Sequence, residues 1–501
     1  MDSFNSGPEN SSLSQNDSDV GAIRGAIMQK REILKCIDRE IEQLVEKRKG
    51  IEEDLVRLVI MDAPHNHNRL PNEVLIRIFI LVARGYGPVH FPVPGSMERP
   101  PQLPISHVCS HWRRVALHTS ELWSNTHLTY PAEINLGKAV YLRHWRRWLI
   151  RAGTFPVRLS IDFDHSLLNN GEFASVLQTI LLPFHVKSLH LSLTHENLME
   201  LSTLTEVALS DLIDVSLDLT LSDAELNINV NDPHPHHLIT RLRSLTLRGS
   251  EESNVGLGKL PPALPWSQLQ SLDFADLYVK DLRSLVKILH QTPMLQVLSL
   301  LICKSHINAL QEFTMPSLRY FRLVTGYDVD EGTDLDAILH SFACPSLVRL
   351  ELRAYSLWTV ESLETIKRQY NMQGLEELNL ASFPLSISSI LQNAPMLRTL
   401  SVGSGAILDD VAITGISNGT LGRFLTNLDL CYISCDVNEV VGMVETRMKT
   451  VNGLIGNSCS WIEDITLIKD LGVHIGHDRD EKLNRDIAKL EEAGINISLW
   501  P

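Results

Sequence analysis

The sequence predicts a mixed α/β chain with three parts: a long N-terminal helix, a small all-α module and a solenoid with short parallel strands. Three observations predict this arrangement. Apolar residues follow a heptad pattern near the N-terminus, helical apolar stripes flank a proline-rich stretch at 85–104, and an apolar trio recurs along the last two thirds. The chain has 501 residues. At about 150 residues per domain, that length allows roughly three units of core.

Composition narrows the class of protein. Lys and Arg number 45 against 60 Asp and Glu, a net charge of −15 that argues against nucleic acid as the main partner, since phosphates need concentrated positive charge. Residues 1–18 are polar and predict a disordered tail without a signal-peptide core. The longest uncharged stretch, 379–397, contains Ser, Gln, Asn and Pro, so we expect no membrane span. Seven cysteines without a CxxC pair predict reduced thiols and a cytoplasmic and/or nuclear location.

Residues 19–62 are predicted to form a coiled-coil helix. Apolar residues recur in alternating steps of three and four over more than five heptads, which is typical of helices that pair along one side. Two basic residues interrupt this seam, and two interpretations remain open. Residues 20–58 could form a homodimer or bind a partner helix, or the helix could fold back on its own chain. The seam consists of Val20, Ile23, Ile27, Lys30, Leu34, Ile37, Ile41, Leu44, Arg48, Ile51, Leu55 and Leu58.

Residues 66–125 are predicted to form a small helical module. Pro71 suits the first turn of a helix, and Glu73 lies where the helix dipole stabilises negative charge. The stretch 85–104 carries six prolines and three glycines, which predicts a loop, and helical spacing resumes at 105–116. The first helix presents one wide apolar stripe of Val74, Leu75, Ile78, Phe79 and Val82.

The order of residues in this module resembles the F-box. Leu-Pro-x-Glu-Val-Leu-x-x-Ile-Phe begins at Leu70, Val-Cys-x-x-Trp-Arg begins at Val108, and Leu-Trp closes the module at 122–123. The resemblance covers about 54 residues, from 70 to 123. It departs from the family pattern in the proline-rich insert, and similar inserts occur in F-box proteins of the fungal type.

The resemblance implies a non-catalytic subunit of an SCF-type ubiquitin ligase. F-box modules bind the Skp-family adaptor of a cullin–RING ligase, and the rest of the chain then captures a substrate. Size also favours a partner, because about 50 residues cannot bury so many large side chains among themselves. The alternative is a helical subdomain packed on its own chain. The resemblance assigns adaptor binding to Leu70, Pro71, Val74, Leu75, Ile78, Phe79, Val108, Trp112, Leu122 and Trp123.

The segment 126–155 is predicted to be an amphipathic helical linker. Aromatic and basic residues alternate in 141–151, a pattern that could stack on nucleic acid bases. On a helix, however, Leu142, Trp145, Trp148 and Leu149 share one side and the arginines line the other. We therefore interpret this segment as a helix that bridges two domains.

Residues 156–501 carry a recurring apolar trio, in which the second and third members follow the first by three and five positions. From 186 to 425 nine intervals separate the first members, and all nine measure between 22 and 30 residues. This regular spacing, rather than the trio itself, indicates repeated structural units. The trios begin at Val186, Leu212, Leu242, Leu269, Leu295, Leu318, Leu347, Leu375, Leu397, Leu425 and Ile462.

The trios alternate with helical spacing, as in Leu282, Leu285, Val286 and Leu289, and again in Leu335, Ile338, Leu339 and Phe342. A strand, loop and helix repeated about every 26 residues predict an irregular leucine-rich-repeat solenoid, since one unit cannot bury its apolar face alone. The Asn or Cys expected after each trio is mostly missing, apart from Cys303. Strand positions between the apolar residues would face a concave, substrate-binding surface; they include Asp273, Arg322, Glu351, Arg353 and Asn379.

Residues with catalytic or metal-binding spacing are interpreted as structural. His107 and His111 are four apart but lack a third ligand, and Cys431 and Cys435 lack a second pair. We expect no catalytic residue, metal or cofactor.

Together with the repeats, the resemblance to the F-box implies the substrate-recognition subunit of an SCF-type E3 ubiquitin ligase, acting in ubiquitin-dependent protein degradation. Its expected partners are a Skp-family adaptor, through it a cullin–RING ligase, and an unidentified protein substrate, with no nucleic acid or membrane. The alternative is a coiled-coil and leucine-rich-repeat scaffold without a ligase role.

Overall fold

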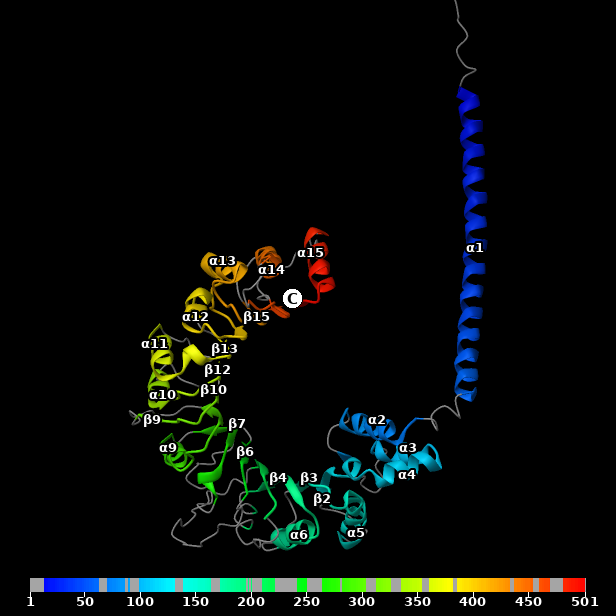
Figure 1. The fold of residues 1–501 in the computed structure, drawn as a ribbon. Helices are drawn as coiled ribbons and strands as arrows, with labels where there is room; N and C mark the ends of the chain where they lie inside the picture. The colour runs from blue at the N-terminus through cyan, green and yellow to red at the C-terminus, as the bar shows by residue number, and fades with distance from the viewer. Residues whose placement is uncertain are drawn as a thin grey trace, which may run out of the picture.

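The computed structural model describes residues 13–62, 70–85, 89–90, 99–130, 138–163, 172–194, 197, 200, 210–220, 241–249, 264–279, 282–302, 312–325, 335–353, 360–381, 385–432, 437–453, 459–468 and 481–500. Within these residues the fold is mixed α/β, as predicted. A long N-terminal helix is followed by a helical region and then by a curved series of parallel strands (Figure 1).

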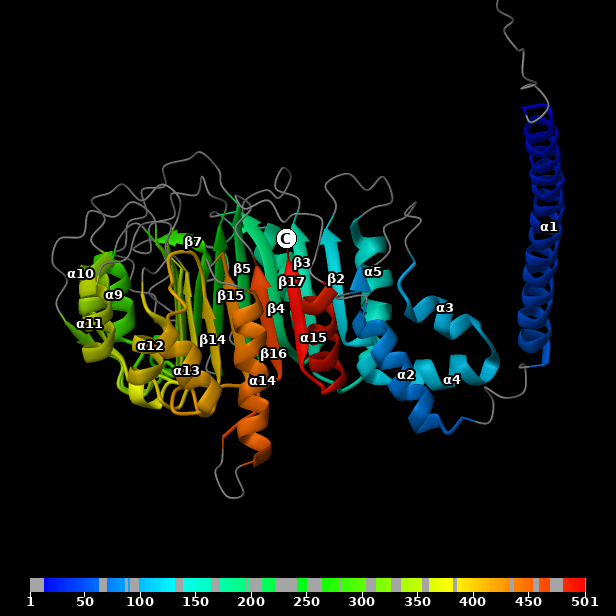
Figure 2. The same cartoon turned by 90° about the horizontal axis from the view of Figure 1, so that it is seen from above.

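The N-terminal helix α1 extends over Leu13–Asp62, which is 50 residues. It begins before residue 19, so the predicted tail at 1–18 overlaps its first turns; residues 1–12 lie outside the described part. A repeat of apolar residues cannot locate such a start, because backbone hydrogen bonds continue the helix through polar residues. Every side chain from 25 to 55 is exposed, and α1 stands apart from the sheet (Figure 2).

Three short helices and a 3-10 turn form the helical region, whose core contains Leu75, Phe79 and Trp123. The Sγ atom of Cys109 accepts a hydrogen bond from the backbone N–H of Trp112 at 3.4 Å, which caps the last of these helices. The elements are α2 (Asn72–Gly85), α3 (Gln102–His107), α4 (Ser110–His118) and η3 (Ser120–Trp123).

The proline-rich stretch 85–104, predicted as a loop, contains regular structure in its described part. The strand β1 (Val89–His90) pairs with β2 (Asn125–Tyr130) in parallel, and α3 begins at Gln102 directly after Pro101. Proline is compatible with the start of a helix, where its missing N–H costs nothing. The prediction of a loop was therefore wrong at Val89–His90 and from Gln102 onward.

The segment 126–155 is not helical throughout, which corrects the predicted linker. Its first part is β2, which pairs with β3 (Val157–Phe163) along its full length. Thr126 and Leu128 are buried because alternate residues of a strand point to the same side. The second part, α5 (Lys138–Leu149), is a helix that buries Trp145 and Trp148 and exposes its arginines.

Among the described residues, fifteen strands form one sheet in which every neighbouring pair is parallel. This series is consistent with a solenoid. Its remaining strands are β4 (Val186–Thr194), β5 (Asp214–Thr220), β6 (Ser244–Gly249), β7 (Ser271–Val279), β8 (Val297–Ile302), β10 (Tyr320–Thr325), β12 (Arg349–Arg353), β13 (Glu377–Ala381), β14 (Thr399–Val402), β15 (Asn427–Cys431), β16 (Asp464–Ile468) and β17 (Asn496–Trp500). The strands β9 (Phe313–Thr314) and β11 (Phe342–Ala343) form a separate pair.

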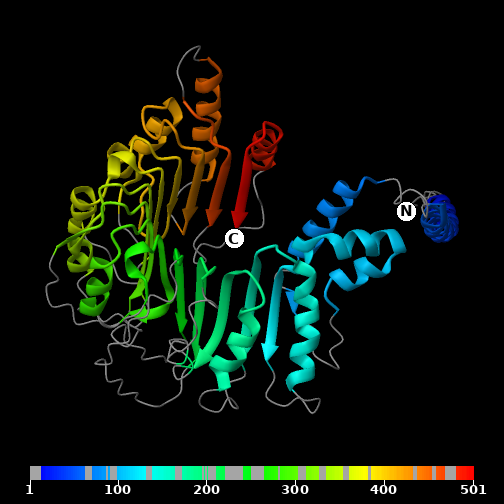
Figure 3. The ribbon, with the colours of Figure 1, turned by 60° about the horizontal axis from the view of Figure 1, so that its bottom comes forward.

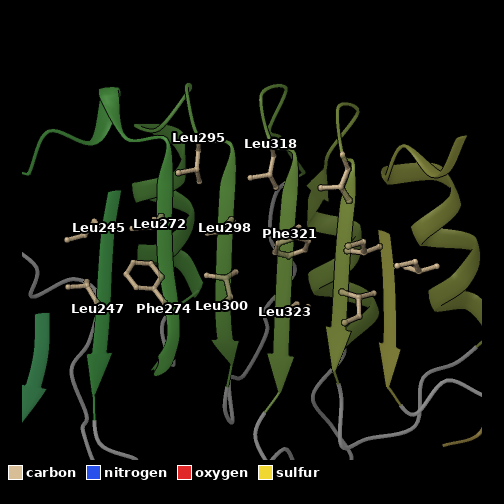
Figure 4. Packing of buried hydrophobic residues seen from close by; sticks show 14 of the residues in the cluster. Leu245, Leu247, Leu272, Phe274, Leu295, Leu298, Leu300, Leu318, Phe321 and Leu323 are labelled. Carbon is tan, nitrogen blue, oxygen red and sulfur yellow. The ribbon is translucent and has the colours of Figure 1, made fainter. Parts of the chain in front are cut away.

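The predicted apolar trios build the core of this sheet. Every side chain of the eleven trios is buried. The second members lie in register from strand to strand, so that Leu272 pairs with Leu298 and Leu298 with Phe321 (Figure 4). Each unit therefore closes the apolar face of its neighbour, as expected for stacked repeats.

Helices cover the outer side of the curve and strands line its inner side (Figures 1 and 3). The two helices predicted between trios are present as α9 (Leu282–His290) and α10 (Leu335–Ser341), except that Phe342 of the second stripe lies in β11. Asp409 caps α13 by accepting a hydrogen bond from the N–H of Ala412 at 2.8 Å, and Gly419 ends that helix at φ +74°. The outer helices are α6 (Glu172–Leu181), α9 (Leu282–His290), α10 (Leu335–Ser341), α11 (Val360–Gln369), α12 (Ile387–Asn393), α13 (Asp410–Asn418), α14 (Val437–Gly453) and α15 (Glu481–Glu492).

Candidate functional sites

The helix α2 is apolar on two adjacent sides, of which one is buried among the described residues. Leu75 and Phe79, one turn apart, are fully buried. Val74, Ile78 and Val82 have the same spacing but remain about two-fifths exposed, at 41%, 38% and 40%. The second side is therefore an apolar stripe that nothing within the described chain covers.

Other apolar residues of the helical region are also exposed, and we name the whole exposed set the module surface. Trp112 on α4 is half-buried, and its ring lies 5.0 Å from that of Phe79. Exposed aliphatic side chains of this kind are typical of protein contacts when they gather on one element. The exposed members of the module surface are Leu70, Val74, Ile78, Leu81, Val82, Val108 and Leu117.

The structure divides the ten predicted adaptor-binding residues into two groups. Leu70, Pro71, Val74, Ile78 and Val108 are exposed, and Trp112 is half-buried. The other four are buried in the internal core of the module. These buried residues are Leu75, Phe79, Leu122 and Trp123. The exposed Leu81 was missed because the motif does not include it, although it lies on the same helix.

Trp123 joins the helical region to the sheet. Its indole N–H donates to the backbone oxygen of Ala116 at 2.8 Å, and its ring meets Trp148 edge-on at 4.7 Å. The guanidinium of Arg151 lies 4.5 Å from the centre of the Trp123 ring. Partial burial lowers the pKa of Arg151 from its usual value. These contacts fix the position of Trp123 between the two parts of the chain.

The predicted substrate-facing residues come together on the inner side of the sheet. Asp273 and Arg322 both pair in register with Ser299, and Glu351 pairs with Arg322 and with Asn379. Four of the five predicted residues therefore form one row across neighbouring strands. Arg353 lies two residues further along β12, where side chains point to the same side.

Glu351 is the centre of a polar cluster on this row. Its carboxylate accepts hydrogen bonds from the Tyr320 hydroxyl at 3.0 Å and from Nε of Arg322 at 3.2 Å, and Nε of Arg353 lies 2.7 Å away. Only 15% of the Glu351 side chain is exposed, so these charges attract each other more strongly than they would in open solvent. The polar cluster consists of Tyr320, Arg322, Arg349, Glu351, Arg353 and Glu377.

Three members of the polar cluster were not predicted. Arg349 is ion-paired with Glu377, and its guanidinium lies 5.3 Å from the centre of the Tyr320 ring. The hydrogen bond with Glu377 raises the pKa of Arg349, while burial and the neighbouring Glu351 raise the pKa of Tyr320 to about 12. These residues lie two positions before the predicted ones, so the same strand alternation could have found them.

The part of the chain that the structure describes was also searched for metal clusters and membrane-spanning helices. Nowhere among the described residues do three or more His, Cys, Asp or Glu side chains gather closely enough to hold a metal ion. Cys435, which was considered together with Cys431, lies outside the described part. None of the described helices is long and apolar enough to cross a membrane.

The fold defines a class of chain that couples a small helical module to a curved array of parallel strands. Residues 67–129 match the family model described as F-box-like. This match covers the helical region and most of β2, and it supports an F-box in that part of the chain. Among curated proteins, none matches this chain.

Proposed function

We propose that this chain is the substrate-recognition subunit of an SCF-type E3 ubiquitin ligase. The module surface would bind a Skp-family adaptor and, through it, a cullin–RING ligase. The parallel-strand array, which we interpret as an irregular leucine-rich-repeat solenoid, would bind a protein substrate on its inner side. The chain would act in the cytoplasm, the nucleus or both, and would catalyse no step itself. It would accelerate ubiquitin transfer by holding a substrate near the charged carrier.

The observation that carries the proposal is the apolar stripe of α2 within the F-box-like segment. Val74, Ile78 and Val82 leave apolar area in water, although Leu75 and Phe79 on the same helix are buried. Covering a large aliphatic side chain contributes up to roughly 1.5–3 kcal/mol, so several half-covered residues suffice for a stable interface.

Co-purification with a recombinant Skp-family adaptor tests this proposal. The double variant Val74→Glu, Ile78→Glu places two carboxylates on the stripe, and we expect adaptor affinity to fall at least about a hundredfold. The matched control is Val411→Glu on α13, because Val411 is also an exposed aliphatic residue on a helix, at 57%. The control should bind like the wild type.

Two outcomes would count against the adaptor role. A folded wild-type chain that does not bind the adaptor would favour the alternative function, a scaffold that assembles partners without ubiquitin transfer. Equal binding by the double variant and the wild type would place the adaptor elsewhere on the chain. A substitution at Leu75 would not separate these cases, because Leu75 is fully buried and its loss would unfold the module.

The polar cluster supports substrate binding on the inner side. It carries three arginines, two glutamates and a tyrosine, and Arg349 and Arg353 are each 49% exposed. Arginine and tyrosine are enriched where proteins bind one another. In a reconstituted ligase, Arg322→Ala with Arg353→Ala should reduce ubiquitylation of the proteins that the wild type modifies. Arg368→Ala on the outer helix α11 should leave it unchanged, and equal activity of both variants would move the substrate site elsewhere.

A further inference from the structure

The seam of α1 is an apolar surface without a partner in the described part of this chain. All of its described members are exposed, and the apolar ones range from 46% for Ile37 to 62% for Leu44. So many aliphatic side chains along one side of a single helix are typical of a coiled-coil strand. The charge pattern on and beside the seam then restricts the partner and its direction.

Lys30 and Arg48 are the two basic residues of the seam. In a parallel homodimer each seam residue faces its own copy, so Lys30 would face Lys30 and Arg48 would face Arg48. Both layers would bring like charges together in an apolar environment, which is costly. An antiparallel pair can avoid this repulsion, because Lys30 and Arg48 then no longer face their own copies.

We propose that two copies of α1 form an antiparallel homodimer in which Ile41 of one copy lies opposite Leu44 of the other. In this register Arg48 faces Ile37, and Lys30 faces Leu55. Each basic residue therefore lies beside an aliphatic side chain, and its long stem can carry the charge to the edge of the interface. Among the seam residues whose side chains the structure describes, the facing pairs are Leu34 with Ile51, Ile41 with Leu44, Arg48 with Ile37, and Leu55 with Lys30.

Charges beside the seam favour the same register. Glu40 directly precedes Ile41, and Lys47 directly precedes Arg48. In antiparallel coiled coils such flanking residues of the two helices face each other, so in this register Glu40 of one copy lies opposite Lys47 of the other. On the other edge Arg31 lies opposite Glu52, which already accepts a hydrogen bond from Nε of Arg48 at 2.9 Å. Symmetry doubles both contacts, which gives four attractive pairs and no like-charge pair along residues 27–58.

Neighbouring antiparallel registers are less favourable. A shift of one heptad in one direction places Arg48 opposite Lys30 and Glu40 opposite Glu40. The opposite shift places Lys47 opposite Lys47 and Asp54 opposite Glu40. Like charges that face each other, in the seam or beside it, destabilise a coiled coil and so disfavour both shifted registers.

The antiparallel arrangement separates the two helical modules. Each module follows the C-terminal end of α1, and in this register the two ends lie about 60 Å apart at 1.5 Å per residue. A parallel dimer would instead bring both modules side by side. This inference does not depend on adaptor binding, because it rests on α1 alone.

Sedimentation equilibrium of the full-length chain at low salt tests both the stoichiometry and the direction. Glu40→Lys places a second positive charge against Lys47, so the dimer should weaken about tenfold, and adding Lys47→Glu should restore wild-type affinity to within about twofold. Glu46→Lys is the matched control. It makes the same charge change on the outer side of α1 and should not alter the dimer.

A parallel dimer predicts a different pattern. Glu40 would then lie beside Val45, so Glu40→Lys alone would bind like the wild type. The double variant would bind more weakly than the wild type, because Lys47→Glu would turn the attraction to Glu52 into a repulsion. That pattern would overturn the proposal. A wild-type chain that is monomeric at tens of micromolar, with α1 helical by circular dichroism, would also overturn it.

Disulfide cross-linking gives an independent measure of direction. One copy carries Lys30→Cys and another carries Leu55→Cys, both with the exposed Cys36 changed to Ser. On mild oxidation we expect a cross-link between positions 30 and 55 in the mixture, identified by mass spectrometry, and none within either variant alone. Cross-links from position 30 to position 30 would refute the antiparallel arrangement.

Discussion

Replacement of Arg447 tests the cohesion of the C-terminal repeats. This side chain on α14 is 1% exposed, and its guanidinium donates only to backbone oxygens in the contacts described. Burial lowers the pKa of Arg447, and its acceptors belong to the end of α13 and to the turns before β15 and β16. The bonds run from Nη1 to Ile416 at 2.9 Å, from Nη2 to Gly422 at 2.8 Å and Arg423 at 3.1 Å, and from Nε to Ser460 at 3.2 Å.

The variant Arg447→Met keeps most of the side-chain volume and removes all four donors. Three of the acceptor oxygens would keep a backbone N–H partner, from Gly419, Leu425 and Ser460. The free energy of unfolding therefore falls by less than it would if all four oxygens were left without a hydrogen bond. At 1.5–3 kcal/mol for a hydrogen bond from a charged group, less the relief of not burying a guanidinium, we expect about 2–4 kcal/mol.

Hydrogen exchange is the appropriate assay, because a chain of this length need not unfold in one step. In Arg447→Met, backbone amides of β15 and β16 should exchange faster by the factor that corresponds to about 2–4 kcal/mol. The exchange rates of amides in α2 should stay unchanged. The control Lys449→Met lies on the same helix and is 78% exposed, so it should change exchange little. A change below about 0.5 kcal/mol in Arg447→Met would refute this account of the repeats.

Two further predictions concern ionisable groups. Burial alone would raise the pKa of Asp409, but hydrogen bonds from Ser386, Ala412 and Ser388 lower it. Asp409→Ala should therefore cost about 1 kcal/mol in urea unfolding at pH 7. The difference from wild type should begin to shrink only below about pH 4 and should be lost as the pH falls through the lowered pKa of the Asp409 carboxyl. Burial raises the pKa of Cys344 to about 12, so at pH 9 iodoacetamide should label this thiol only after unfolding; labelling in the folded chain would contradict its burial.

The apolar trios predicted the strands in the middle of the sheet. They missed strands near its two ends, such as β2 and β17, because these strands lack one apolar member of the trio. The pattern requires three apolar residues, but β2 has Thr126 where most strands have leucine, and this threonine is buried all the same. In β17 the position three before Ile497 is Gly494, with φ +91°, so a turn replaces the first apolar member. Strands at the ends of an array meet fewer neighbours and depart most from the consensus.

The module surface could be predicted only in part. The stripe on α2 covers more than half of the helix, and periodicity alone does not say which side faces the core. Val74 and Leu75 are adjacent and equally apolar, yet one is 41% exposed and the other fully buried. Tertiary packing against α4 decides between them, and that information lies outside the local sequence.

The two-residue strand β1 has a consequence for solubility. A parallel array has an unpaired strand at each end, and a long unpaired strand can add strands from other molecules and seed aggregates. Here β1 covers part of β2 and is itself too short to serve as a template for another chain. Replacing residues 86–98 by a short glycine linker should therefore leave the edge of β2 open and make the purified protein aggregate at lower concentration.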